Sequence, residues 1–250
     1  MKILVTAKRV IDPDARIKLT ADSSGVDTDT VEYKVNPFDE NAIEAALELA
    51  DDHDAEVVIA SIGPDDVTQT IRSGLAMGAE RGIRVDYEDN DLDSDLAARI
   101  LAGVCKEEEP DLIILGKQAI DGDNNQVGQL LAEYLGLPQA CFASEIEIDG
   151  DEVVVTREVD GGLETIALKL PALVTADLRL NEPRYASLPG IMKAKRKPID
   201  VLDLDDLEIE DTALKVEVVR LEEPPSKEAG VLVDDVDALF DKLSNEARVL

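Results

Sequence analysis

One loop of this sequence, residues 116–129, carries residue types that can hold a nucleotide phosphate. It reads Gly-Lys-Gln-Ala-Ile-Asp-Gly-Asp-Asn-Asn-Gln-Val-Gly-Gln and separates an apolar run from a helical segment. Glycines leave backbone N–H groups accessible, Asn and Gln amides add donors, and the amino end of the following helix adds unpaired N–H groups. It is not a Walker loop, because no Gly-Lys-Ser or Gly-Lys-Thr follows at the required spacing. We therefore predict a nucleotide site here, against the alternative of a plain polar loop.

A second candidate phosphate loop follows the apolar run 56–62. The Gly-Pro pair at 63–64 forms a turn, after which Asp65 or Asp66 is placed to cap a helix that carries Arg72 in its first turns. An ordinary strand-to-helix turn explains the same residues, so both interpretations stay open.

The composition argues against other kinds of site. His53 is the only histidine and lies in the acidic run 51–54, which predicts a solvated turn and excludes His-based triads and multi-His metal sites. Cys105 and Cys141 have no CxxC spacing, so we expect two small buried thiols and no bound metal. No apolar run approaches about 18 residues and no secretory leader is visible. We therefore expect a cytoplasmic protein without a membrane span.

The elements that must position these loops follow a βαβ pattern. Short β-rich apolar runs alternate with segments in which apolar residues recur every three or four positions. The predicted strands are 2–7, 56–62, 83–87 and 111–115, and the predicted helices are 41–51, 66–76, 96–108 and 126–135. This alternation predicts an α/β fold with a Rossmann-like, doubly wound, mainly parallel sheet. In such a sheet, ligands bind at the carboxyl ends of the strands.

Two further features complete the predicted architecture. Residues 153–159 and 165–169 alternate apolar and polar side chains around a short turn, which predicts a hairpin added to the edge of the sheet. After residue 220, the segment 222–225 interrupts regular structure, and a short amphipathic helix at 234–243 nearly ends the chain. We therefore expect one α/β domain over residues 1–220 and a C-terminal arm over 221–250.

The chain is strongly acidic, with 56 Asp and Glu residues against 25 Lys and Arg and a formal net charge of −31. Such a surface repels phosphates along a nucleic acid, which excludes that class of partner. Hydrophobic residues make up 44% of the chain and argue for a folded core. Acid spread along a folded chain is typical of a salt-adapted protein, because salt screens the self-repulsion.

Several segments resemble the β subunit of electron transfer flavoproteins, and the similarity spans nearly the whole chain. They are 8–12, 36–38, 116–129, 157–165 and the run ADLRLNEPRYASLPGIMKAKRK at 176–197. The resemblance implies an α/β domain similar to adenine nucleotide α-hydrolases, in a salt-adapted, haloarchaeal member of the family. It implies a non-catalytic subunit that binds AMP structurally and pairs with an α subunit, which holds most of the FAD.

The same resemblance implies a place in electron transport during fatty acid oxidation. Electrons would arrive from acyl-CoA and other flavin dehydrogenases and leave to an electron transfer flavoprotein–quinone oxidoreductase. The chain itself would not span a membrane.

The resemblance also places the AMP site residue by residue. The matching segments are the end of the first strand, the Asn-Pro-Phe segment, the end of the second long strand, and the 116–129 loop with its helix. The matching residues are Thr6, Ala7, Asn36, Pro37, Phe38, Asp39, Ile62, Asp121, Gly122, Asp123, Asn124, Asn125, Gln126, Val127, Gly128, Gln129, Leu130, Leu131 and Ala132. Asn125, Gln126, Gly128 and Gln129 carry the closest match.

A partner-docking loop is implied at 184–197. Its matching residues are Arg184, Tyr185, Leu188, Pro189, Ile191, Met192, Lys193 and Lys195. Leu188 matches an apolar anchor that enters a pocket on the dehydrogenase, and the nearby prolines stiffen such a loop. A buried core leucine is the alternative.

Charged residues near this loop have two interpretations each. The cluster formed by Lys193, Lys195, Arg196 and Lys197 is the only basic one in an acidic chain, which favours steering or contact with the α subunit over a generic solvated face. Glu158 matches a glutamate that poses the mobile FAD domain of the α subunit through a charge pair, or it is one more surface acid.

Two other functions stay open. In bifurcating electron transfer flavoproteins, the β subunit binds a second FAD in place of AMP and exchanges hydride with NADH. Such members carry a TAQVGP-like segment, whereas this chain has Asn-Asn-Gln-Val-Gly-Gln at 124–129, which favours AMP. An ATP-hydrolysing or ATP-sensing protein of the same architecture is the third possibility, although the chain lacks an SGG-type or Walker-type loop.

Overall fold

The computed structural model describes residues 1–28, 31–225 and 229–250. Within that part, the chain forms two compact units: Met1–Ile17 with Thr28–Val218, and Lys18–Asp27 with Val219–Leu250. The predicted arm 221–250 falls in the second unit, and its residues 226–228 lie outside the described residues. The nucleotide and docking residues predicted above all belong to the first unit.

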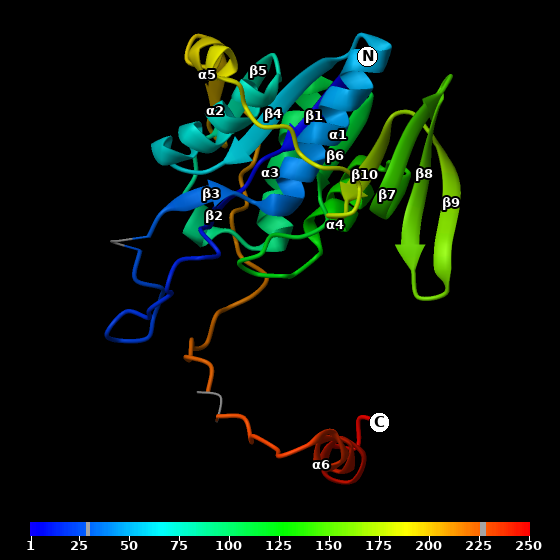
Figure 1. Ribbon diagram of the computed structural model, residues 1–250. Helices are drawn as coiled ribbons and strands as arrows, with labels where there is room; N and C mark the ends of the chain where they lie inside the picture. The colour runs from blue at the N-terminus through cyan, green and yellow to red at the C-terminus, as the bar shows by residue number, and fades with distance from the viewer. Residues whose placement is uncertain (29–30, 226–228) are drawn as a thin grey trace. The chain divides into compact units, whose positions relative to one another are not determined.

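The first unit is built on a nine-stranded sheet with the order β11-β5-β4-β1-β6-β10-β7-β8-β9 (Figure 1). The pairs from β11 through β7 are parallel, and β7-β8-β9 form an antiparallel extension. The strands of this sheet are β1 (Lys2–Thr6), β4 (Glu56–Ile62), β5 (Arg81–Val85), β6 (Leu112–Gly116), β7 (Gln139–Asp149), β8 (Glu152–Val159), β9 (Gly162–Lys169), β10 (Ala172–Ala176) and β11 (Ile199–Leu202). A separate two-stranded ladder pairs β2 (Arg9–Ile11) with β3 (Tyr33–Val35). The predicted α/β fold is confirmed.

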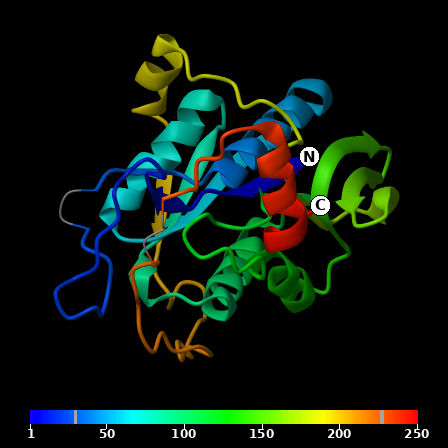
Figure 2. The ribbon, with the colours of Figure 1, turned by 60° about the horizontal axis from the view of Figure 1, so that its bottom comes forward.

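Helices cover both faces of the parallel sheet, as Figure 1 and Figure 2 show. Residues of α1 (Pro37–His53) and α2 (Thr68–Met77) share one core with Ile3 and Val5, which alternate along β1. Residues of α3 (Ser94–Glu108) and α4 (Val127–Leu135) share the other core with Leu4. A strand buried on both faces reads as a continuous apolar run, which is why β1, β4 and β6 were visible in the sequence.

The predicted elements are largely confirmed, with shifts at their ends. The strand predicted at 83–87 is β5, two residues earlier, and the hairpin predicted at 153–159 and 165–169 is β8-β9 at the edge of the sheet. The prediction that Asp65 or Asp66 caps a helix is wrong, because a 3₁₀ turn at Asp65–Val67 precedes α2 and neither side chain caps it. The helix α5 (Leu188–Ala194) and the edge strand β11 were missed.

The second unit contains α6 (Val236–Asp241), where the side chain of Asp235 accepts a hydrogen bond from Ala238 N at 2.8 Å. A wider helical turn continues over Lys242–Ala247. The helix predicted at 234–243 is therefore present. Several apolar side chains of this unit are exposed, among them Leu232, Val236 and Phe240.

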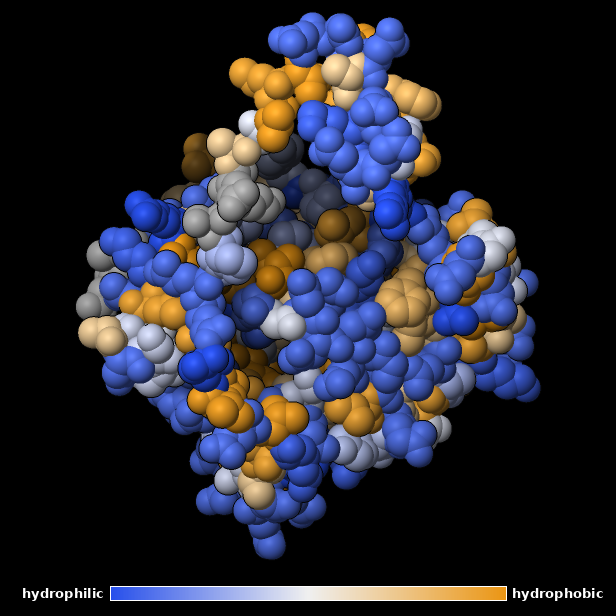
Figure 3. All heavy atoms as spheres, turned by 90° about the horizontal axis from the view of Figure 1, so that it is seen from below, coloured by the Kyte–Doolittle hydropathy of each residue, from blue (hydrophilic) through white to orange (hydrophobic). Residues whose placement is uncertain are grey.

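On the face drawn in Figure 3, hydrophilic residues cover most of the area and hydrophobic residues are scattered among them. Across the described residues, no helix is both long and apolar enough to cross a membrane.

Candidate functional site

A cavity of about 190 Å³ lies at the carboxyl edge of the parallel strands, where the sequence predicted a ligand. Its walls come from the ends of β1, β4 and β6, the loop that follows β6, and the amino end of α3. The predicted residues that line it are Thr6, Ala7, Asn36, Asp39, Ile62, Asp121, Gly122, Asp123, Asn124, Asn125, Gln126 and Val127. Four segments that are far apart in the sequence therefore converge on one cavity.

The structure places the other predicted nucleotide residues outside the lining: Pro37, Phe38, Gly128, Gln129, Leu130, Leu131 and Ala132. Leu131 and Ala132 are fully buried in the core shared with α3. A Cβ at Gly128 would lie 2.5 Å from Thr175 Cγ2, so this glycine allows α4 to pack closely against β10. Gly128, Leu131 and Ala132 therefore hold α4 beside the cavity through core packing.

Sequence analysis missed one wall of the cavity. Residues Asp89, Asp93, Ser94 and Ala97, at the start of α3 and just before it, also line the cavity. The available signal was the strand order, because β5 leads into α3 and the carboxyl ends of neighbouring parallel strands share one edge. The strand at 83–87 was predicted, but its neighbours in the sheet were not.

The loop between β6 and α4 is held by polar contacts from Asn36 and Lys8. Asn36, which is 1% exposed, donates from Nδ2 to Gln118 O at 2.9 Å and accepts from Ile120 N at 3.2 Å. The Lys8 ammonium donates to both carboxylate oxygens of Asp121 at 2.7 and 2.8 Å. Within the loop, Asp123 and Asn125 both have φ near 49°, a left-handed conformation that Asp and Asn tolerate. Their identity therefore shapes the backbone that faces the cavity.

The two helices that begin at the cavity differ in their amino ends. Asp93 caps α3, accepting from Leu96 N at 2.8 Å and from Lys215 N at 2.5 Å. Burial opposes ionisation of Asp93, but these backbone donors hold its pKa below the ordinary value. At α4, by contrast, Gln126 makes no side-chain cap and the first turn has no acidic residue. The first N–H groups of α4 are thus available to an anion at the cavity.

Asp39 joins three segments of the cavity wall from a fully buried position in the first turn of α1. Its carboxylate accepts from Lys8 N at 2.8 Å and from Gly116 N at 2.9 Å, which are the backbones leaving β1 and β6. Burial raises the pKa of Asp39 to about 6, against the lowering effect of those two donors. Asp39, which the sequence placed among the ligand contacts, therefore also has a structural role in building the wall.

The remaining cavity surface is divided into a polar and an apolar part. Besides the polar residues of the loop, the lining includes the apolar residues Leu92, Ala97 and Leu101, from α3 and just before it, and Leu115 of β6. One acid on the lining, Asp89, is compensated by Arg9, which forms a two-pronged ion pair with it at 2.5 and 3.0 Å. A ligand with a flat apolar ring and an anionic end matches this division.

The second candidate phosphate loop does not form a site of its own. Ile62 lines the cavity, but Arg72 points elsewhere and donates from Nη1 to Ala194 O and Lys197 O, both at 2.5 Å. The plain strand-to-helix turn is therefore the better description of this loop beyond Ile62.

The predicted docking residues lie around α5 and are mostly exposed. Tyr185 is 100% exposed and Leu188 is 74% exposed, which excludes the alternative of a core leucine. Ile191 and Met192 are also exposed, as are Pro189, Lys193 and Lys195, whereas Arg184 is half-buried. Lys197 departs from the predicted basic cluster, because its ammonium donates to Leu75 O, Gly78 O and Ala79 O at the end of α2.

Glu158 lies near the end of β8 and forms an ion pair with Arg179 of the same chain.

Cys105 and Cys141 are buried free thiols, as predicted, and burial raises the pKa of Cys105 to about 12. In the described part of the chain, no group of three or more His, Cys, Asp or Glu side chains is arranged to hold a metal ion.

Comparison with known proteins decides the family. The electron transfer flavoprotein domain matches residues 24–207. The chain is 54% identical to the electron transfer flavoprotein subunit beta of Bradyrhizobium diazoefficiens over 251 residues, covering 100% of both chains. The chain belongs to the electron transfer flavoprotein β-subunit family.

Two further relatives belong to the same family. The mitochondrial electron transfer flavoprotein subunit beta of Arabidopsis thaliana is 52% identical over 253 residues, and both chains are covered completely. The human electron transfer flavoprotein subunit beta is 49% identical, covering 100% of this chain and 99% of the human one. Full-length similarity of this kind supports an electron-transfer function for the chain.

Proposed function

We propose that this chain is the β subunit of a heterodimeric electron transfer flavoprotein, and that it binds AMP in the cavity without performing catalysis itself. The observation that carries the proposal is the uncapped amino end of α4 at a cavity with one apolar wall, in a chain 54% identical to a named β subunit. Together with an α subunit, the chain would accept electrons from acyl-CoA and other flavin dehydrogenases. It would pass them toward a quinone reductase.

The cavity offers each part of AMP a chemically matched surface. The first N–H groups of α4 and the amides of Asn124, Asn125 and Gln126 suit the phosphate, because a helix amino end attracts an anion. The wall formed by Leu92, Ala97, Leu101 and Leu115 suits the adenine ring. AMP in this position would tie the loop after β6 to α3, and so would stabilise the subunit without taking part in a reaction.

One phosphate fits this cavity better than two. Of the two helix amino ends at the cavity, α3 has an acidic side-chain cap, Asp93, whereas α4 has no side-chain cap. The second FAD of a bifurcating complex carries two phosphate groups, which would need more hydrogen-bond donors than the single phosphate of AMP. This difference favours AMP over the bifurcating alternative.

FAD held at the interface with the α subunit would supply the redox chemistry, because it can take up and release electrons singly or in pairs. The residues of this chain would contribute position and charge. Glu158 near the end of β8, whose present partner Arg179 is exposed, would exchange that pair for a cation of the mobile FAD domain. Such an exposed ion pair is weak enough to be exchanged.

The proposal is tested by nucleotide analysis of the co-expressed heterodimer, using Gln126→Asp and the neutral control Gln126→Asn. The new carboxylate of Gln126→Asp would cap α4 and repel a phosphate, so AMP affinity should fall about tenfold or more. Gln126→Asn should keep AMP. Mass spectrometry of released nucleotides should give one FAD and one AMP for the wild type and the control.

Three results would contradict this assignment. Two FAD molecules per wild-type heterodimer would establish the bifurcating alternative. Full AMP occupancy in Gln126→Asp would place the nucleotide elsewhere. Turnover of ATP by the purified heterodimer would revive an ATP-hydrolysing function.

A further inference from the structure

The segment that carries the docking residues is held by hydrogen bonds to α1 at one end and to α2 at the other. In Figure 1 and Figure 2, the yellow chain leaves β10, runs across α1 and enters α5, which lies against α2. The outward side of this segment is apolar: Tyr185, Leu188 and Met192 are exposed. Its inward side packs Leu180, Ala186 and Ala194 on the core and is also held by polar side chains of α1 and α2.

The attachment to α1 uses two buried polar residues. Glu44, which is 4% exposed, accepts hydrogen bonds from Arg184 N and Arg184 Nε, all at 2.9 Å. One turn earlier, Asn41 donates to Asn181 O at 2.8 Å and to Asn181 Oδ1 at 2.9 Å, and Asn181 Nδ2 returns a bond to Asn41 O at 3.0 Å. The segment before Leu188 is therefore fixed in both its backbone and its side chains.

The attachment to α2 begins directly after the exposed leucine. Ser187 caps α5 by accepting from Gly190 N at 3.1 Å, and a Cβ at Gly190 would lie 2.5 Å from Ala76 O. Arg72 then donates to two carbonyl groups at the end of α5, as described above. Leu188 thus projects from a short helix that lies between two sets of anchors.

Glu44 is an unusual residue to find in this position. Burial of a carboxylate is unfavourable unless its hydrogen bonds are satisfied, and an apolar side chain would serve the α1 core better. The Arg184 guanidinium and backbone satisfy Glu44, and neither residue lines the nucleotide cavity. What the pair achieves is the order of the segment that presents Leu188.

We propose that Glu44 is a positioning residue of the docking surface. By holding Arg184, it orders the segment before a partner arrives, so that less conformational entropy is lost on docking. The exposed cations Lys193, Lys195 and Arg196 beside the apolar side chains define the partner: a dehydrogenase with an apolar pocket rimmed by acidic groups. This inference rests on the proposed docking function.

A double-mutant cycle on the heterodimer tests the inference. The variants are Glu44→Gln, Leu188→Ala and their combination, with Asp52→Asn as a control that removes one exposed charge from the same helix. The assay follows reduction of the bound FAD by an acyl-CoA dehydrogenase from the same genome. The heterodimer concentration is varied while the dehydrogenase concentration is held fixed. Melting temperature and nucleotide content are measured in parallel.

We expect Leu188→Ala to raise the KM for the heterodimer about tenfold or more, because it removes an interface anchor. Glu44→Gln should raise this KM about fivefold with kcat within about twofold, because it loosens the anchor and leaves the chemistry unchanged. In the Leu188→Ala background, Glu44→Gln should have almost no further effect on KM, since both changes act on one interaction. Asp52→Asn should match the wild type.

Each departure from this pattern has a defined meaning. Additive effects of Glu44→Gln and Leu188→Ala on KM would overturn the positioning role, and so would an unchanged KM in Glu44→Gln. An unchanged KM in Leu188→Ala would instead overturn the docking function on which the inference rests. If Glu44→Gln does not fold, Asn181→Ala serves as a second variant, because it removes the hydrogen bonds between the same segment and Asn41. A rise in KM that disappears in the Leu188→Ala background supports the proposal. A rise that adds to that of Leu188→Ala overturns it.

Discussion

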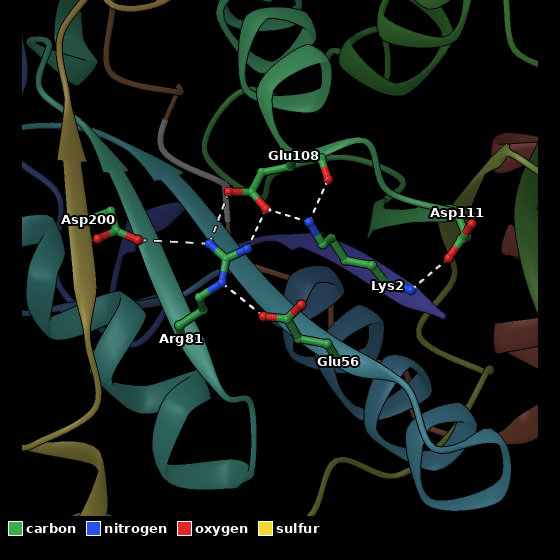
Figure 4. A network of polar contacts seen from close by, with 6 residues as sticks. All are labelled: Lys2, Glu56, Arg81, Glu108, Asp111 and Asp200. Atoms are coloured by element: carbon green, nitrogen blue, oxygen red, sulfur yellow. Dashed lines mark hydrogen bonds and ion pairs between the residues drawn. The ribbon is translucent and has the colours of Figure 1, made fainter.

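The two ends of the parallel sheet differ in how completely their charged groups are paired. At the amino ends of the strands, Arg81 of β5 reaches Glu56 of β4 at 2.9 Å and forms a two-pronged pair with Glu108 at the end of α3 (Figure 4). Lys2 of β1 also donates to Glu108, at 3.1 Å, and to its carbonyl at 2.6 Å. Every one of these groups has a partner of opposite charge.

At the carboxyl ends of the same strands, the first N–H groups of α4 have no side-chain cap, and Asp39 is a buried carboxylate with a raised pKa. A buried carboxylate without a cationic partner is costly, and a helix end without a cap is incomplete. The amino end of the sheet is therefore arranged for stability, whereas the carboxyl end keeps unfavourable features that a ligand can use. Three predictions probe this difference.

The largest effect is expected at the amino end. Arg81→Met should leave Glu108 and Glu56 without their shared cation and lower the free energy of unfolding by about 2 kcal/mol, less than for a fully buried pair because Arg81 is 21% exposed. AMP content should not change. Denaturant unfolding and nucleotide analysis measure both.

The control is Arg157→Met, which breaks the more exposed pair between Arg157 and Glu164 on the β8-β9 hairpin and should change stability by under about 1 kcal/mol. Equal losses in the two variants, or loss of AMP in Arg81→Met, would contradict the division of roles between the two ends.

The second prediction uses pH, because the two ends respond with opposite sign. The folded pKa of Asp39, about 6, lies above the ordinary 3.8, so its contribution to stability is full below about pH 4 and is lost as pH rises through 6. Arg81 holds the pKa of Glu108 below its ordinary 4.5, so that contribution is present above 4.5 and is lost as pH falls.

Asp39→Asn should remove the first of these contributions. Raising the pH from about 5 to about 7 should cost the wild type about 1 kcal/mol more than it costs Asp39→Asn, measured by denaturant unfolding at both pH values. The exposed Asp14→Asn should keep the wild-type dependence. Identical dependence in the wild type and Asp39→Asn would show that Asp39 does not titrate in this window.

The smallest effect concerns salt. Raising NaCl from about 0.1 to about 2 M should raise the melting temperature of the wild type, because screening relieves the repulsion within a chain of net charge −31. The stability difference between Arg81→Met and the wild type should shrink by under about 1 kcal/mol, because this network is only partly exposed to the salt. A wild-type melting temperature that does not change with salt would refute the first expectation. Complete loss of the stability difference between Arg81→Met and the wild type at high salt would refute the second.

Several features of the site were predictable from short segments of sequence. The loop at 116–129 combines glycines with amides directly after a buried strand, and backbone donors of that kind depend only on local chemistry. The exposed position of Leu188 was one of two interpretations, favoured by the family resemblance and by the stiffening prolines nearby, and the structure confirms it.

Other features needed the fold. The burial of Asp39 was not visible, because an acid after Asn-Pro-Phe is equally compatible with a solvated first turn of a helix. It is buried because β1 and β6 are neighbours in the sheet, and their departing backbones both donate to it. The same holds for Lys197, which the sequence grouped with its basic neighbours and which the packing of α5 on α2 turns toward carbonyl groups.

The sequence by itself determined the class of fold and the loop that lines the cavity, since apolar periodicity and turn chemistry act over a few residues. Only the tertiary structure decided which residues meet. Strand order brought α3 to the cavity, made Glu44 a support for Arg184 some 140 positions later, and placed the ion pairs of Arg81 at the opposite end of the sheet. Contacts at such separations depend on how all the elements pack together, and no local pattern encodes them.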